Sequence, residues 1–267
     1  MSHDRPGLDA VAEPHDDIPA YERQNASMLE RRSKLAPRFA QQIALTVAPT
    51  LGRPLSECDV VDIGCGYGHT AHALAAEARS VVGIEPSAAL AAEADALARG
   101  SSRPMRVLHG GHERLLEYPA SFDLAVMDNV FEHIPDQAAA LHHVSVALRP
   151  GGCLYMLVPN RLWPMEVHYH LPGLSWLPVP LANAYLRATG RGEDYTDASY
   201  APTAAGLMAL FAEQPSLEAR FVLPGDVSLA QGVSPLYRLG VKAIGRWPAL
   251  WQISKALLVV ARRRSQP

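Results

Sequence analysis

A run of apolar residues that ends in a glycine-rich turn constrains the fold of this chain more than any other feature. The run is Val60-Val61-Asp62-Ile63, followed at once by Gly64-Cys65-Gly66-Tyr67-Gly68 and an alanine-rich helical pattern. A short apolar run with β-branched residues is typical of a buried parallel strand. Glycine in the following turn permits positive φ angles and lets a ligand lie against bare backbone. The stretch therefore predicts a strand–turn–helix unit that binds a nucleoside or phosphate, with a purely structural tight turn as the alternative.

Predicted strands and helices alternate through the region that contains this turn. The expected strands cover residues 59–63, 80–85, 105–109, 122–128 and 153–158, and the expected helices cover 67–78, 87–99 and 136–148. Ser87 is a suitable N-cap for the second of these helices. Such alternation indicates βαβ units with right-handed crossovers. We therefore expect an α/β fold with a doubly wound, mostly parallel sheet and helices on both faces.

The N-terminal part precedes the first strand and has a different composition. Residues 1–20 are polar, acidic and interrupted by prolines, so we expect a disordered lead-in rather than a signal peptide. A helical N-terminal segment follows, with one helix from 21 to 36 and a second from Pro37 to 47. These helices would pack on the sheet or cover the ligand turn.

The regular alternation stops after the fifth predicted strand. Residues 161–200 are rich in Pro, Trp, Tyr and His and too long for a bare loop, which predicts a cap insertion with short helices. Beyond it we expect a helix at 203–213, a strand at 217–223, an irregular segment at 224–254 and a last strand at 256–261. A single domain would then span residues 21–267, with its core at 58–160 and 201–261.

Composition narrows the classes of function and the location. The net charge is −3, and seven basic residues with no acidic residue follow Asp226, which leaves −10 on the first 226 residues. This balance disfavours a nucleic-acid partner. No apolar run approaches the roughly 18 residues of a membrane span. The three cysteines lack metal-ligand spacing, so we expect a reduced, cytoplasmic protein.

The basic C-terminal region suggests a second location. Arg238, Lys242 and Arg246 are spaced four apart, as are Trp247 and Trp251, so a helix would place each set on one face. Such a face would contact anionic lipid or a lipid-linked substrate. A merely solvated face is the alternative, and Gly240, Gly245 and Pro248 weaken the helix prediction.

Two acidic residues narrow the identity of the ligand at the glycine turn. Asp62 would repel a pyrophosphate, and it suits an ammonium or sulfonium group instead. Glu85 ends the next predicted strand, 21 positions after Gly64. From there a carboxylate can accept both ribose hydroxyls of a bound nucleoside. A solvated residue at a strand end is the structural alternative for Glu85.

Four short motifs follow one another between residues 58 and 160. They are Asp62-Ile63-Gly64-Cys65-Gly66-Tyr67-Gly68, Ile84-Glu85-Pro86-Ser87, Ser121-Phe122-Asp123-Leu124-Ala125 and Leu148-Arg149-Pro150-Gly151-Gly152. In this order and spacing they resemble the class I S-adenosylmethionine-dependent methyltransferases. The resemblance implies a mostly parallel seven-stranded sheet with an antiparallel last strand. It also implies that S-adenosylmethionine lies across the carboxyl ends of the first, second and fourth strands.

The same resemblance assigns the cofactor contacts. The glycine turn and Asp62 would hold the amino-acid portion, Glu85 the ribose, and Pro86 would flank the adenine. An Asp that often holds the adenine amino group in relatives is missing here, where the matching run is Gly110-Gly111-His112-Glu113, and either His112 or backbone groups would hold the adenine instead. The full set of implied cofactor-binding residues is Asp62, Gly64, Cys65, Gly66, Gly68, Glu85, Pro86, His112, Glu113, Asp128 and Asn129.

Three histidines are candidates for a general base. His133 follows the fourth strand, and His168 and His170 lie in the predicted cap, where a capping subdomain with backbone-bonded histidines is the alternative. A Glu-x-x-Glu-His pattern binds a divalent metal in some ubiquinone-pathway O-methyltransferases and in a small-RNA methyltransferase group. Here Asn129 replaces the first glutamate, and Glu132 with His133 alone is a poor hard-cation site. We therefore expect no metal.

These observations predict an S-adenosylmethionine-dependent enzyme that methylates a small molecule, on oxygen, with a sugar, a lipid-linked intermediate or a secondary metabolite as acceptor. An NAD(P)-linked oxidoreductase on a similar sheet is one alternative, opposed by Asp62 and by the early third glycine, Gly68. A methyltransferase-like scaffold without catalytic activity is the other.

Overall fold

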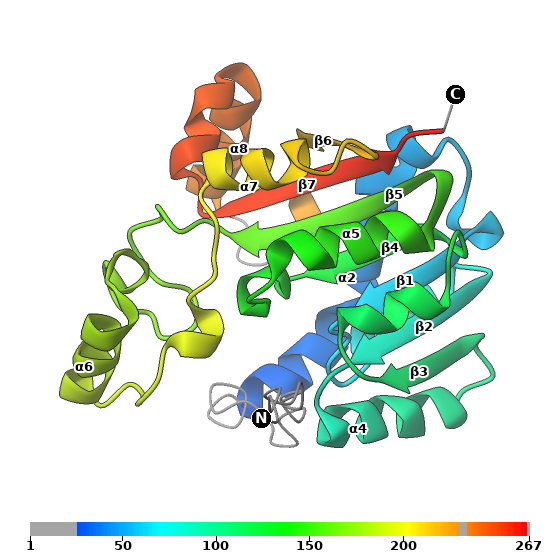
Figure 1. Ribbon diagram of the computed structural model, residues 1–267, viewed down its shortest axis with the longest axis horizontal. Coiled ribbons are helices and arrows are strands. Elements are labelled where there is room, and N and C mark those ends of the chain that lie inside the picture. Colours follow the sequence, from blue (N-terminus) through cyan, green and yellow to red (C-terminus); the bar gives the residue numbers. More distant parts are fainter. Residues whose placement is uncertain (1–25, 230–233, 266–267) are drawn as a thin grey trace, which may run out of the picture.

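A seven-stranded sheet forms the centre of the protein in the computed structural model, which describes residues 26–229 and 234–265 (Figure 1). The strand order is β3-β2-β1-β4-β5-β7-β6. Strand β7 runs antiparallel between β5 and β6, while the neighbouring strands from β3 to β5 pair in parallel. The bounds are β1 Asp59–Ile63, β2 Ser80–Glu85, β3 Met105–His109, β4 Phe122–Asp128, β5 Leu148–Pro159, β6 Leu217–Phe221 and β7 Ala256–Arg263.

Helices cover both faces of the sheet, as the sequence predicts. Figure 1 shows α5 and α7 over one face and α2 over the other. Polar residues cap α5 and α7: the Asp136 side chain accepts from Ala139 N at the start of α5, and the Thr203 side chain accepts from Gly206 N at the start of α7. The bounds are α2 Ala26–Leu51, α3 His69–Leu74, α4 Ala88–Arg99, α5 Gln137–Ala147, α6 Val179–Thr189, α7 Ala204–Ala212 and α8 Pro235–Arg246.

Three local predictions are wrong in the helices. Residues 26–51 form one helix, α2, with Pro37 inside it, rather than two helices. A proline removes one backbone donor and one helical hydrogen bond, and α2 continues past this defect. Helix α3 is shorter than the predicted 67–78, since Gly68 is its left-handed N-cap and turns follow Leu74. The segment predicted as irregular contains α8, which begins with Ser234 as N-cap and Pro235 in its first turn.

Strand β5 begins earlier than predicted, because the Pro150-Gly151-Gly152 sequence is a bulge rather than a strand boundary. The register between β4 and β5 shifts between Phe122 and Leu124. A Cβ on Gly152 would lie 2.9 Å from Asp123 O and 3.0 Å from Arg149 O, so only glycine fits there. The bulge brings Arg149 Nη1 within 2.7 Å of the buried Asp123 Oδ2 and 2.9 Å of Asp59 Oδ2.

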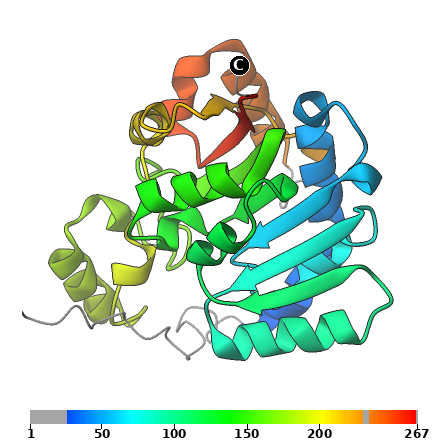
Figure 2. The same ribbon diagram turned by 45° about the vertical axis from the view of Figure 1, so that its right-hand side comes forward.

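The cap segment, residues 161–200, has a small apolar core of its own. Its buried residues are Leu171, Leu174, Ala182, Leu186, Tyr195 and Ala198, separate from the main core under the sheet. The cap lies beyond the end of the sheet to which the parallel strands point (Figure 2). Backbone hydrogen bonds from Arg161 N to Pro202 O and from Tyr200 N to Glu132 O join it to the main domain.

Within the described ranges, no helix is both long and apolar enough to cross a membrane. The three cysteines, Cys58, Cys65 and Cys153, are free and buried. The predicted disordered residues 1–20 lie outside the described residues.

Candidate active site

Three carboxylates lie at the carboxyl ends of adjacent parallel strands. Asp62 belongs to β1, Glu85 ends β2 and Asp128 ends β4. Successive strands are added on one side of β1 as far as β3, and from β4 onward on its other side. The strand order therefore reverses between β1 and β4, and ligands of open α/β sheets bind at such a switch point. Burial, followed by the charges of Asp128 and Glu85, raises the pKa of Asp62 to about 8. The site is therefore built to receive a positive charge.

The glycine turn after β1 is held in place by the strand beside it. Gly64 N donates to Ile84 O at 2.7 Å, and Gly66 N donates to Glu85 Oε2 at 2.8 Å. Gly64 and Gly66 have φ angles of 68° and 54°, which favour glycine. A Cβ on Gly64 would lie 2.7 Å from the methyl carbons of Val130, whereas none of the described residues lies within 4 Å of a Cβ on Gly66. Within the described part of the chain, the backbone of Gly66 is therefore accessible to a ligand.

Two other residues of the turn support it from behind. The Cys65 side chain is buried, and a Cβ on Gly83 would lie 2.7 Å from its Sγ, so the thiol packs against β2. A Cβ on Gly68 would lie 2.9 Å from Ala94 Cβ, so this glycine allows α3 to approach α4. Cys65 can therefore offer its backbone to a ligand, while Gly68 sets the packing of the helix.

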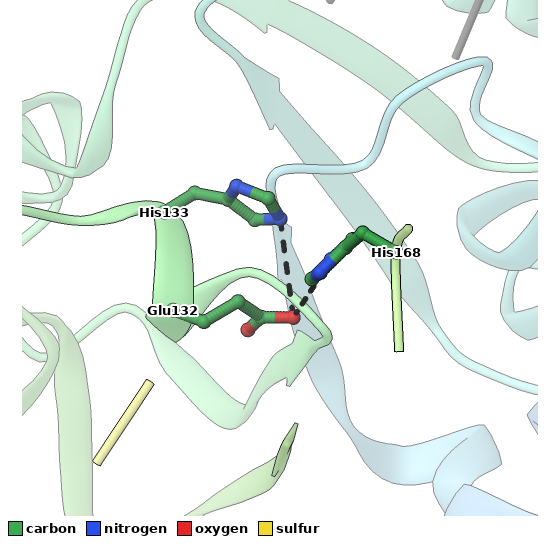
Figure 3. Close-up of side chains that lie close together, drawn as sticks. All are labelled: Glu132, His133 and His168. Atoms are coloured by element: carbon green, nitrogen blue, oxygen red, sulfur yellow. Dashed lines mark ion pairs between the residues drawn. The ribbon is translucent and has the colours of Figure 1, made fainter. Parts of the chain in front are cut away.

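A second cluster lies just beyond β4, where Glu132, His133 and His168 face one another (Figure 3). One ligand atom of each lies within 4.8 Å of the others. Nε2 of His133 is 3.9 Å from Glu132 Oε1, and Nε2 of His168 is 3.8 Å from the same oxygen. Glu132 and His133 belong to the turn Phe131–His133, whereas His168 comes from the cap.

Each histidine of this cluster is oriented by an acidic residue on its other ring nitrogen. His168 Nδ1 lies 2.7 Å from Glu166 Oε1. The other carboxylate oxygen, Glu166 Oε2, accepts from the backbone N of His168 and of Tyr169. His133 Nδ1 lies 3.2 Å from Asp197 Oδ2 and 3.1 Å from the carbonyl oxygen of Asp197. Both Nε2 atoms are thereby turned toward Glu132.

Glu132 is fully buried, and neither of its carboxylate oxygens has a hydrogen-bond partner among the described residues. Burial raises the pKa of Glu132, and the charges of His133 and His168 oppose that shift. The charge of Asp128 raises the pKa of both Glu132 and Asp62, so this residue is close enough to act on both clusters.

Comparison with known proteins finds methyltransferases similar to the central part of this chain. Residues 61–154 match the family model described as a methyltransferase domain. A ubiquinone biosynthesis O-methyltransferase from Rhizobium rhizogenes is 34% identical over 113 residues, which are 42% of this chain and 46% of that protein. The central part of this chain is therefore similar to methyltransferases. The match spans about half the length of that curated relative.

Solved structures share the fold of this chain. The plantazolicin methyltransferase BamL, in complex with a triazolic desmethylPZN analog and SAH, aligns with a TM-score of 0.55 and 15% identity, over 92% of this chain and 88% of its own. The [4+2]-cyclase SpnF aligns with a TM-score of 0.53 and 18% identity, over 86% of this chain and 82% of its own. At these identities the likeness shows the fold alone.

The remaining residues that the sequence predicts to bind the cofactor differ in their surroundings. Asp128 accepts from Asn129 Nδ2 at 2.8 Å at the end of β4, beside the carboxylate cluster. The Pro86 carbonyl oxygen lies 3.0 Å from His109 Nε2. His112 Nδ1 lies 2.9 Å from Nδ1 of His143 on α5, and the exposed Glu113 accepts from Gly111 N. The side chains of His112 and Glu113 are thus engaged within the protein.

The three histidines that the sequence predicts as catalytic do not form one group. His133 and His168 meet, whereas His170 is exposed and lies outside the cluster. The sequence pattern did not indicate that Glu132 lies between two histidines or that Glu166 orients the ring of His168. The spacing Glu166-x-His168 was an available signal, since a carboxylate two residues away can orient an imidazole. Nothing in the sequence placed that pair against Glu132.

Proposed function

We propose that this protein transfers a methyl group from S-adenosylmethionine to an oxygen atom of a small molecule. The observation that carries the proposal is the group of carboxyl groups at the strand ends, in which Glu85 and Asp128 act on the buried Asp62 and Glu85 accepts from Gly66 N. When bound, S-adenosylmethionine supplies a methyl group on a positively charged sulfur, and it also carries an ammonium group. A buried, acidic site at the switch point of the sheet suits such a ligand.

Each residue of the site has a specific task in this proposal. Glu85 fixes the glycine turn through Gly66 N and would accept the ribose hydroxyls. Asp62 would face the ammonium group, with Asp128 beside it. The backbone of Gly64, Cys65 and Gly66 would line the amino-acid portion. The cap beyond the strand ends would hold the acceptor close to the methyl group, and positioning of this kind supplies much of the acceleration of a displacement reaction.

The acceptor that we propose is a hydroxyl-bearing sugar, lipid-linked intermediate or secondary metabolite. The names of the relatives, which include O-methyltransferases, support transfer to oxygen. The −10 charge of the first 226 residues disfavours a nucleic acid. The cap brings aromatic, acidic and imidazole side chains together near β4, which is suitable for a compact organic acceptor.

The oxidoreductase alternative receives less support from the fold. Dinucleotide-binding sheets have the order 3-2-1-4-5-6 with parallel strands, whereas here an antiparallel β7 enters between β5 and β6. A pyrophosphate would also be disfavoured here, because it would add negative charge where neighbouring carboxylates already raise the pKa of the buried Asp62 to about 8. The scaffold alternative is the more serious one, because a protein of this fold can carry a different chemistry, as the cyclase SpnF illustrates by its name.

We further propose that α8 places the enzyme at an anionic membrane surface. Leu236, Leu239 and Trp247 are 77%, 62% and 60% exposed, and Arg238, Lys242 and Arg246 follow along the same helix. Exposed apolar side chains next to basic ones are typical of interfacial helices. Such a location would give access to a lipid-linked acceptor.

Two measurements test the proposed function. Calorimetry with S-adenosylhomocysteine, the product of the donor, is expected to give micromolar binding that disappears in Glu85→Ala; absence of binding to the unaltered protein would refute the cofactor assignment. Incubation of a metabolite extract with the protein and isotope-labelled S-adenosylmethionine is then expected to label a product that mass spectrometry identifies. Cofactor binding without any labelled product would favour the scaffold.

A further inference from the structure

We propose that Glu132, His133 and His168 bind a divalent transition-metal ion. The three side chains come from two separate segments, the turn after β4 and the cap, and their ligand atoms lie within 4.8 Å of one another. In Figure 3 both imidazole rings direct a nitrogen toward the same oxygen of Glu132. This proposal departs from the expectation of no metal, which rested on Asn129 in place of a glutamate.

The distances suit a site that closes slightly around an ion. Zinc lies about 2.1 Å from imidazole nitrogen and carboxylate oxygen, so two ligands of a tetrahedral site are about 3.4 Å apart. The two Nε2 atoms are 3.9 and 3.8 Å from Glu132 Oε1. Each imidazole would therefore have to approach the Glu132 oxygen by about 0.5 Å, and all three ligand atoms already lie within 4.8 Å of one another.

The environment of Glu132 is the second observation that points to a cation. Its side chain is fully buried, and both oxygens lack a hydrogen-bond partner among the described residues. Leaving a buried acceptor unsatisfied is costly, and for an ionised carboxylate the cost is greater. The two imidazoles stand close enough for attraction but too far for a hydrogen bond. A bound cation would supply the missing partner of Glu132.

The outer groups match those of known metal centres in general. Histidines that bind metals almost always direct their second ring nitrogen to a carboxylate, a carbonyl or water, which fixes the ring and raises its basicity. Glu166 has this position behind His168, and Asp197 behind His133. Asn129 is not part of the group, since its amide donates to Asp128 Oδ1. The site is thus complete without a residue at position 129.

The ligand set favours one class of ion. Two imidazoles and one carboxylate suit zinc and its neighbours in the first transition series, whereas magnesium prefers oxygen ligands and keeps much of its water. Three protein ligands leave at least one coordination position open. If the proposed methyl transfer is correct, that position could hold the acceptor hydroxyl and lower its pKa, with the proton passing to water. This catalytic use rests on the proposed function, but metal binding itself does not.

Metal uptake can be measured without cofactor or acceptor. The full-length protein is stripped with a chelator and titrated with zinc chloride, and separately with magnesium chloride, by calorimetry; cobalt(II) absorption reports the coordination. Glu132→Gln and His168→Ala are compared with His142→Ala, which removes an exposed histidine of α5. Circular dichroism and thermal melting establish that each variant is folded.

We expect one zinc per chain, binding by magnesium weaker by at least a hundredfold, and loss of zinc affinity by more than about 100-fold in both cluster variants, with no change in His142→Ala. No zinc uptake by the unaltered protein would overturn the proposal, as would full uptake by folded His168→Ala. S-adenosylhomocysteine binding, measured on the stripped protein, tests the proposed function independently. If Glu132→Gln fails to fold, His168→Ala alone decides the matter.

Discussion

Glu166 Oε1 lies 2.7 Å from His168 Nδ1, and on the other side of that imidazole Nε2 faces Glu132 Oε1 at 3.8 Å. The ring therefore stands between two buried carboxylates, one from the cap and one from the turn after β4. The cap supplies both the histidine and the group that orients it, so the geometry of the cluster depends on the cap as a unit.

Glu166→Gln is expected to weaken zinc binding by about 10- to 100-fold, because outer carboxylates fix the ring of a metal-binding histidine and raise its basicity. The amide keeps the size of the side chain and one acceptor. Calorimetric titration measures the effect. Glu193→Gln, an exposed substitution in the same cap, is the control and should leave the affinity unchanged. Equal affinities in the two variants would contradict the assigned role of Glu166.

Asp62→Asn is expected to stabilise the ligand-free protein by an amount that grows with pH. Burial raises the pKa of Asp62 to about 8 in the folded state, well above the pKa of an aspartate in an unfolded chain. Between these values the folded state binds more protons than the unfolded state, so this residue lowers stability as pH rises. The advantage of Asn should grow by about 1 kcal/mol for each pH unit in this window.

Urea denaturation at pH 5 and at pH 8 measures this difference between Asp62→Asn and the unaltered protein. Asp95→Asn, an exposed carboxyl on α4, is the control and should show a much smaller dependence on pH. The same Asp62→Asn variant should bind S-adenosylhomocysteine more weakly, because the charge that would face the ammonium group is gone. A pH-independent stability difference would show that Asp62 is ionised in the folded protein.

Glu85→Ala is expected to reduce the affinity for S-adenosylhomocysteine by at least about 100-fold, since two charge-assisted hydrogen bonds to the ribose would be lost at roughly 1.5 kcal/mol each. The glycine turn also loses its acceptor for Gly66 N. Calorimetry gives the affinity and thermal melting the stability. Glu77→Ala, at an exposed position beyond α3, serves as the matched control. Affinity within threefold of the unaltered protein would exclude the ribose contact.

Asp123→Ala is expected to destabilise the fold by about 2–3 kcal/mol. Asp123 is 1% exposed and accepts from Arg149 Nη1, Arg53 Nη2 and Asp59 N. Removing one partner of a buried pair costs about 3–5 kcal/mol, and the partial exposure of both arginines reduces this figure. Asp95→Ala removes the exposed pair with Arg99 and should cost less than about 1 kcal/mol. Urea denaturation compares them, and equal losses would refute the structural role of Asp123.

Replacement of Arg238, Lys242 and Arg246 by Gln is expected to weaken binding to vesicles that contain phosphatidylglycerol by at least tenfold, since each basic residue near an anionic surface contributes about 1 kcal/mol. Cosedimentation with and without the anionic lipid measures it. Replacing Arg99, Arg187 and Arg191, three exposed residues elsewhere, gives a variant of equal net charge. If both triple variants bind alike, α8 is a solvated helix and not a membrane contact.

The strands of the sheet were predictable because their patterns are local. Runs such as Val81-Val82-Gly83-Ile84 combine β-branched residues with a defined end, and the observed β2 begins and ends where the pattern does. The family resemblance added the antiparallel β7, which local patterns do not give. In contrast, β5 begins early because Gly152 lets the chain approach Asp123 O, and that contact is made across strands.

The second cluster was less predictable for a related reason. The sequence around Glu132 and His133 supplies only two candidate metal ligands. The third, His168, reaches them only because the cap folds onto the turn after β4. Tyr200 N donates to Glu132 O, and Gln137 Nε2 donates to Tyr200 O. These tertiary contacts, formed by residues of ordinary composition, bring His168 into place. For α8, Ser234-Pro235 was a sufficient start signal, outweighed in the prediction by Gly240 and Gly245.

The position of β7 has a consequence for synthesis of the chain. Strand β7, residues 256–263, pairs with β5 on one side and with β6 on the other. Strands β5 and β6 therefore do not pair with each other, and they join one sheet only when β7 has been inserted between them. A ribosome must therefore translate past residue 263 before the sheet can close. Until then the edges of β5 and β6 expose unpaired backbone groups, which favour intermolecular pairing. Premature termination upstream of β7 should thus yield chains that aggregate, even though the cofactor turn has already been made.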